Sequence, residues 1–144
     1  MAVRFDPILG LLRMRDTVDN GSILKIATIT GINAKTVATT SLYTVPTGKS
    51  LIVTLFVVRV TAFTAGGKTV QAIYNVGGNA TDYNNILNSV SPTIGAVNEY
   101  YPIILLDGTN LAVQAATTVL TLNITTGSNA TTETWAVDVF GYLV

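Results

Sequence analysis

Short segments of alternating apolar and polar residues dominate this chain. In one of them, Leu120, Leu122 and Ile124 alternate with threonine and asparagine, which gives one face suited to burial and one suited to water. Similar segments, rich in Val, Ile, Thr and aromatic residues, are separated by turn residues. They predict eight strands, at Leu24–Thr30, Thr36–Val45, Ser50–Thr61, Lys68–Val76, Glu99–Leu106, Leu111–Thr117, Leu120–Thr126 and Thr134–Leu143. Strands at this spacing indicate an all-β fold, either an antiparallel β-sandwich or a barrel.

The stretch from Gly77 to Asn98 interrupts this pattern. It is rich in asparagine, glycine and serine, which is typical of turns and irregular segments. Within it, we expect one short helix over Asp82–Asn88.

The strand predicted around Leu51–Val60 has apolar residues on both faces. With regular alternation, one face holds Leu51, Val53, Leu55 and Val57, and the other holds Ile52, Phe56, Val58 and Val60. A two-layer sandwich covers only one face of a strand, so the second face needs a neighbouring subunit or the segment of residues 1–22 that precedes the strands. The alternative is a central strand with a loop folded over it. We therefore expect an oligomer interface at four residues: Leu51, Val53, Phe56 and Val58.

The strand predicted at Thr134–Leu143 holds the only tryptophan of the chain. We expect Trp135 and Phe140 to be largely buried. Asp138 alternates with a buried face and is therefore expected to point outward. Gly141, inside the strand, indicates a bulge or the close approach of another backbone.

Residues 1–22 differ from the rest and are interpreted as an extended N-terminal arm and hinge, followed by a β-sandwich domain at residues 23–144. Six of the sixteen charged residues fall within the first nineteen, mixed with large apolar residues. Pro7 and Gly10 interrupt any helix there. So many apolar residues predict that the arm docks, either on a partner or on the chain's own body. The residues expected to make this contact are Phe5, Ile8, Leu9, Leu12, Arg13 and Arg15.

Composition narrows the chemistry that the chain can support. Cysteine and histidine are absent, which excludes disulfides, thiolate nucleophiles and zinc sites built from these residues. The formal net charge is zero, without the basic patch that nucleic-acid binding requires. No apolar run reaches the roughly 18–20 residues that cross a bilayer. We therefore expect no cofactor, no metal, no nucleic acid and no membrane among the ligands and partners.

The low content of charge bears on assembly. Charged residues make up 11% of the chain, against about 25% in an ordinary domain. A sparsely charged surface with a net charge near zero promotes association. We therefore expect a homo-oligomer.

No motif in the sequence places a catalytic group. Gly48-Lys49-Ser50 has the form of the end of a phosphate-binding loop, but Tyr43 stands where that motif needs glycine and a strand follows instead of a helix. The carboxylates of the predicted sandwich are Asp82, Glu99, Asp107, Glu133 and Asp138. Hydrolysis of a glycosidic bond needs a positioned pair of carboxylates, and no pattern here pairs them. We expect no enzymatic activity.

Three stretches resemble segments of a known class of proteins. AVRFDPILGLLRMRD (Ala2–Asp16) resembles the leading peptide of many small bacteriophage virion proteins. LYTVPTGKSLIVTLFVVRV (Leu42–Val60) is similar to a strand–turn–strand unit in the β-sandwich domains of phage structural proteins, and WAVDVFGYLV (Trp135–Val144) to their last strand. The resemblance implies a jelly-roll-like antiparallel β-sandwich of about eight strands, no catalysis, and often a trimer.

Two functions fit this resemblance. The first is a capsid decoration, or cement, protein that forms a homotrimer on the virion shell and stabilises it through the arm. Its partner would be the major capsid protein or another virion protein. The second is a tail fibre, head fibre or receptor-binding module, anchored by the arm, with a host glycan as its ligand. The number of copies per particle separates the two.

Overall fold

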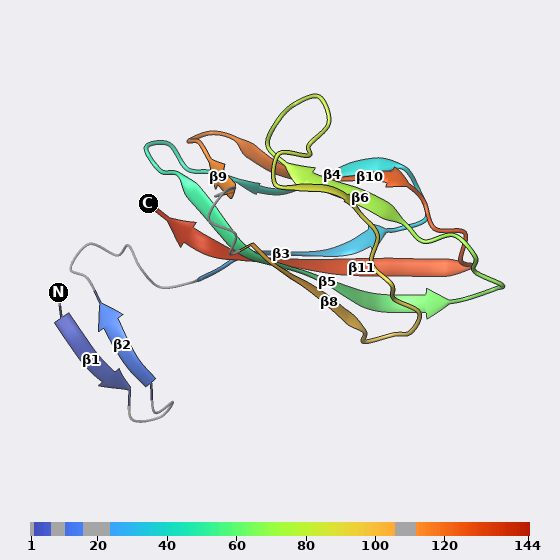
Figure 1. The fold of residues 1–144 in the computed structure, drawn as a ribbon, viewed down its shortest axis with the longest axis horizontal. Helices are drawn as coiled ribbons and strands as arrows, with labels where there is room; N and C mark the ends of the chain where they lie inside the picture. The colour runs from blue at the N-terminus through green and yellow to red at the C-terminus, as the bar shows by residue number, and fades with distance from the viewer. Residues whose placement is uncertain (1, 7–10, 16–23, 106–111) are drawn as a thin grey trace.

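The computed structural model describes the backbone of residues 2–6, 11–15, 24–105 and 112–144, and it contains strands but no helix in these ranges (Figure 1). The strands are β1 (Ala2–Asp6), β2 (Leu11–Arg15), β3 (Leu24–Asn33), β4 (Ala38–Thr44), β5 (Leu51–Thr64), β6 (Ile73–Gly77), β7 (Leu87–Val90), β8 (Tyr100–Ile104), β9 (Ala112–Gln114), β10 (Val119–Thr126) and β11 (Thr132–Leu143). All strand pairs are antiparallel.

Two sheets face each other as the layers of a sandwich (Figure 1). The four-stranded sheet has the order β4-β10-β6-β7, and the five-stranded sheet has the order β3-β11-β5-β8, with β9 also paired to β5. Apart from β9, the sandwich strands pair in a nested order: β3 with β11, β4 with β10, β5 with β8, and β6 with β7. This nested pairing over two sheets is the topology of a jelly roll, which confirms the predicted fold class.

The core lies between the two sheets. Its largest members are Trp135, Tyr74 and Phe56, which are fully buried. The ring centroid of Tyr74 lies 5.9 Å from that of Phe56 and 5.7 Å from that of Trp135, the latter in an edge-on arrangement. Because Tyr74 belongs to one sheet and the other two residues to the opposite sheet, this cluster joins the layers. The prediction that Trp135 is buried is confirmed.

The strand pairing contains several register shifts, and at three of them the unpaired residue is a threonine. Thr54 and Thr61 are the unpaired residues of β5 opposite β11, and Thr125 is the unpaired residue of β10 opposite β6. Each threonine hydroxyl donates a hydrogen bond to a backbone carbonyl of the partner strand, at 3.1 to 3.3 Å. The hydroxyl therefore supplies a cross-strand bond at the point where the bulge interrupts the backbone ladder.

The bulge at Thr54 determines which residues of β5 face the core. Regular alternation puts Val53 and Phe56 on opposite faces, whereas here both are buried between the sheets. Leu55 and Val57 lie on the other face and are half-buried. The prediction of apolar residues on both faces is confirmed, but their assignment to the two faces was wrong because it assumed an unbroken period of two.

The helix predicted over Asp82–Asn88 is absent, and this segment holds turns followed by β7. Asparagine side chains explain the difference. The Asn79 amide oxygen accepts hydrogen bonds from the backbone N–H groups of Asn84 (2.8 Å) and Asn85 (3.3 Å). Such bonds satisfy the backbone locally and compete with helix formation.

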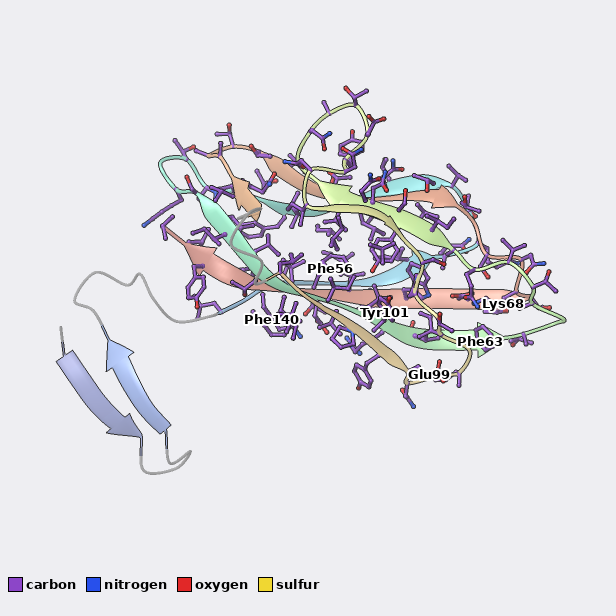
Figure 2. The ribbon with its side chains drawn as sticks, viewed as in Figure 1. Phe56, Phe63, Lys68, Glu99, Tyr101 and Phe140 are labelled. Atoms are coloured by element: carbon purple, nitrogen blue, oxygen red, sulfur yellow. The ribbon has the colours of Figure 1, made fainter. Side chains whose placement is uncertain are left out.

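Strand β11 keeps regular alternation, which places Phe140 with Asp138 on the side away from the core. Figure 2 shows Phe56 and Phe140 on opposite sides of the five-stranded sheet. The prediction that Phe140 is largely buried was wrong, because the side chain is only half-buried. The close backbone contact predicted at Gly141 is confirmed, since a Cβ atom there would collide with the carbonyl oxygen of Ile52.

Candidate interaction surfaces

The N-terminal arm contains two short strands that pair with each other. Among the described strands, β1 and β2 pair with no strand of the sandwich. Their register sets Phe5 opposite Leu12 and Arg4 opposite Arg13. Successive pairs of a two-stranded ribbon alternate between its faces, so the apolar pair and the arginine pair take positions on opposite faces. By this register, the positions of Val3, Phe5, Leu12 and Met14 share one face, and the arginine positions share the other face with Ala2, Asp6 and Leu11.

The residues expected to bind the particle fall partly within this ribbon. Phe5, Leu12, Arg13 and Arg15 belong to β1 and β2. The other two, Ile8 and Leu9, lie outside the described residues.

The four residues expected at an oligomer interface lie in the core. They are Leu51, Val53, Phe56 and Val58, and their exposed fractions are 0% or 1%. A side chain between the two sheets cannot reach a second subunit while the chain is folded. This expectation is therefore corrected, and any subunit contact through β5 has to use the opposite side of that strand.

That opposite side belongs to an apolar surface that we call the outer face of the five-stranded sheet, defined by Leu55, Val57, Tyr100, Pro102, Ile104 and Phe140. The register places Leu55 between Ile104 of β8 and Phe140 of β11. Tyr100 is 62% exposed and Ile104 is 66% exposed. No strand of the described part of the chain covers this face. Contiguous apolar surface of this kind marks sites of protein–protein contact.

A charged cluster lies within the outer face, at Asp138. Its carboxylate accepts bonds from Lys25 Nζ (2.7 Å), Thr28 Oγ1 (2.6 Å) and Arg59 Nε (2.9 Å). Asp138 points away from the core, as predicted, yet these groups cover it so that it is only 6% exposed. Burial by itself raises the pKa of Asp138, but the hydrogen bonds from Lys25, Thr28 and Arg59 outweigh it and hold the pKa below its ordinary value.

A second ionic cluster closes one end of the core. Lys68 Nζ lies 2.8 Å from Glu133 Oε2, and both side chains are almost excluded from solvent. Glu133 also accepts hydrogen bonds from the Ser128 hydroxyl (2.6 Å) and from Trp135 Nε1 (3.0 Å). Figure 2 shows Lys68 beside Phe63, and its ammonium group lies 5.2 Å from the centre of that ring. These contacts leave the cluster no open side for a ligand.

Three of the described carboxylates of the sandwich already have partners within the chain. Glu133 and Asp138 are bound to cations, and Glu99 Oε2 accepts hydrogen bonds from the backbone N–H groups of Gly95 (2.5 Å) and Ala96 (3.1 Å). Asp107 lies outside the described residues. Within the described ranges, no group of three or more acidic side chains is arranged to hold a metal ion. No helix there is long and apolar enough to cross a membrane.

No protein-family profile matches this sequence, and no characterised protein matches it either. Comparison with solved structures is informative. A chain in the structure of the cyanophage Pam1 capsid asymmetric unit superposes with a TM-score of 0.55 at 13% identity, covering 96% of this chain and 97% of that chain. A chain in the structure of the capsid of Ralstonia phage GP4 gives a TM-score of 0.55 at 17% identity, covering 90% of each. The fold is shared with chains from two phage capsids.

Sequence reasoning predicted that Asp138 points away from the core, but it missed both ionic clusters. Arg59 and Thr28 are 79 and 110 residues away from Asp138 in the sequence. No local spacing could have joined them. The one usable signal was a charged residue in the middle of an apolar strand, which predicts a partner because an unpaired charge is costly to bury.

Proposed function

We propose that this chain is a capsid decoration protein of a bacteriophage, located on the virion and anchored to it through β1 and β2. The observation that carries the proposal is the likeness to chains from two phage capsid structures over nearly the whole length of each. Since the coverage is 97% and 90% of those chains, they are about as long as this one. The likeness therefore extends over nearly the full length of both of those chains.

Two properties of the chain support this role. The arm combines apolar and arginine positions on opposite faces of a ribbon, and an isolated two-stranded ribbon is at best marginally stable in water. It gains a stable form by docking on a partner. The low charge of the chain favours assembly into a homo-oligomer, and we propose a trimer.

Truncation of the arm tests the anchoring. The full chain and a variant lacking residues 1–19 are mixed with shells from a phage whose copy of this coding sequence is deleted, and both are sedimented. We expect the full chain to sediment with the shells, and the truncated chain to stay in solution with a near-normal melting temperature. Equal binding of both chains would show that the arm is not the anchor. Unfolding of the truncated chain would show that the arm belongs to the body.

A further inference from the structure

The outer face of the five-stranded sheet has no assigned role in the proposed function, which uses the arm. Its centre is formed by the half-buried Leu55 and Val57, and its rim by the exposed Tyr100 and Ile104. A two-layer sandwich offers nothing of its own to cover this side. The Lys25–Asp138–Arg59 cluster lies on the same side, since Asp138 is paired with Val57 in the register.

The charge of this cluster is unbalanced. Two cations, Lys25 and Arg59, share the single carboxylate of Asp138, which leaves one positive charge on the face. Lys25 has 48% of its side chain exposed, so a partner can reach it. Arg59 uses Nε to bind Asp138, and its side chain is 29% exposed. An apolar surface with one excess cation is complementary to an apolar surface that carries a carboxylate.

The sandwich of a second copy, as far as the structure describes it, offers few free carboxylates for this contact. Within the described part of the sandwich, Glu133 and Asp138 are already paired with cations, and Glu99 binds the backbone of its own turn. Among these residues, only the carboxylate of Asp82, in the loop before β7, has no ion-pair or hydrogen-bond partner. The charge balance therefore favours a different protein as the occupant.

We propose that the outer face docks on an acidic, partly apolar surface of a shell protein, as a contact additional to the arm. This inference rests on the proposed function, because it takes the partner to be part of the particle. The arm then binds the shell at a distance from the sandwich, and the outer face fixes the orientation of the sandwich on the shell. Two separate contacts on one chain raise the overall affinity through effective concentration.

Point variants of the full chain test this docking, in binding titrations with shells that lack the protein. The double variant Tyr100→Ser and Ile104→Ser removes the exposed rim, and Lys25→Met removes the excess charge with little change in volume. The matched controls are Val37→Ser, which is 64% exposed between β3 and β4, and Lys49→Met in the turn before β5. Circular dichroism melting checks that each variant is folded.

We expect the double variant to bind the shells about tenfold more weakly, and Lys25→Met to weaken binding and reduce its dependence on salt, with both controls unchanged. If the unaltered chain binds and the outer-face variants bind as well as the controls, the inference fails and the proposed function stands. If the unaltered chain does not bind shells at all, the proposed function fails and the inference with it. If the double variant instead loses self-association and keeps shell binding, the occupant is a second copy and the assignment to a shell protein is overturned.

Discussion

Lys68 Nζ and Glu133 Oε2 lie 2.8 Å apart at the end of the core, with 5% and 0% of their side chains exposed. Removing one member of a buried ion pair leaves the other charge without a partner. The free-energy cost of that unpaired charge exceeds the stabilisation that the intact pair provides. Lys68→Met should therefore lower the free energy of unfolding by about 3–5 kcal/mol, measured by urea denaturation. The double variant Lys68→Met with Glu133→Gln should lose less than the single variant, because Gln carries no charge and its oxygen can still accept from Trp135 Nε1.

Lys35→Met serves as the control for this pair, since Lys35 is exposed and its ammonium group donates a hydrogen bond to the carbonyl oxygen of Thr131. It should change the free energy of unfolding by less than about 0.5 kcal/mol. A double variant that is no more stable than Lys68→Met alone would contradict the account of an uncompensated charge.

Trp135 should be the most sensitive position of the core. Its side chain is fully buried and packs on Tyr74, and its indole N–H donates to Glu133. Trp135→Ala should lower the free energy of unfolding by about 3–5 kcal/mol through the lost burial and the cavity left behind. A loss below about 1 kcal/mol, in the same denaturation experiment, would mean that the site collapses and that the sheets are not held together by this cluster.

Tyr74 should respond in the opposite direction. Its hydroxyl is buried and has no hydrogen-bond partner among the described residues, and burial together with the nearby Tyr101 raises the pKa of the phenol. Removal of a buried polar group without a partner recovers its desolvation cost. Tyr74→Phe should therefore keep the ring packing and raise the free energy of unfolding by about 1 kcal/mol. A clear destabilisation, by thermal melting, would reveal a partner for the hydroxyl.

Asp138 should make stability depend on pH. Because its pKa is lowered in the folded state, its contribution is present above the unfolded value of about 4 and is lost as the pH falls through the folded value. At neutral pH, Asp138→Asn should be less stable than the unaltered chain by about 1–3 kcal/mol. The difference should shrink as the pH is lowered below about 4.

Asp82→Asn is the matched control, since Asp82 is exposed in the loop before β7. Its stability should follow that of the unaltered chain at every pH. A gap between Asp138→Asn and the unaltered chain that stays constant down to low pH would exclude a titrating carboxylate as its cause.

The alternation of apolar and polar residues along the chain predicted most of the fold. It located eight of the sandwich strands and the buried position of Trp135, because a strand with one wet face shows its alternation locally. It failed where a bulge adds a residue. Nothing in the residues Val53-Thr54-Leu55 distinguishes a bulge from continuous pairing, since the bulge depends on the partner strand β11. The four interface residues expected on β5, drawn from both predicted faces, therefore all lie in the core.

The polar clusters show a second limit. Lys25, Arg59 and Asp138 come from three strands that are neighbours only after the jelly roll has formed. Topology sets such contacts, and topology was inferred from a resemblance and not from local pattern. The short β7 was missed for a related reason, because it forms among asparagine side chains that bond the backbone around it.

The stoichiometry of the virion tests the central claim most directly. A decoration protein repeats with the shell lattice, whereas a fibre occupies only a few symmetric positions on the particle. Quantitative mass spectrometry of purified virions gives the molar ratio of this chain to the major shell protein. The account predicts a molar ratio of this chain to the major shell protein on the order of 1. A ratio smaller by more than an order of magnitude would contradict a capsid decoration role and would indicate a fibre or tail component.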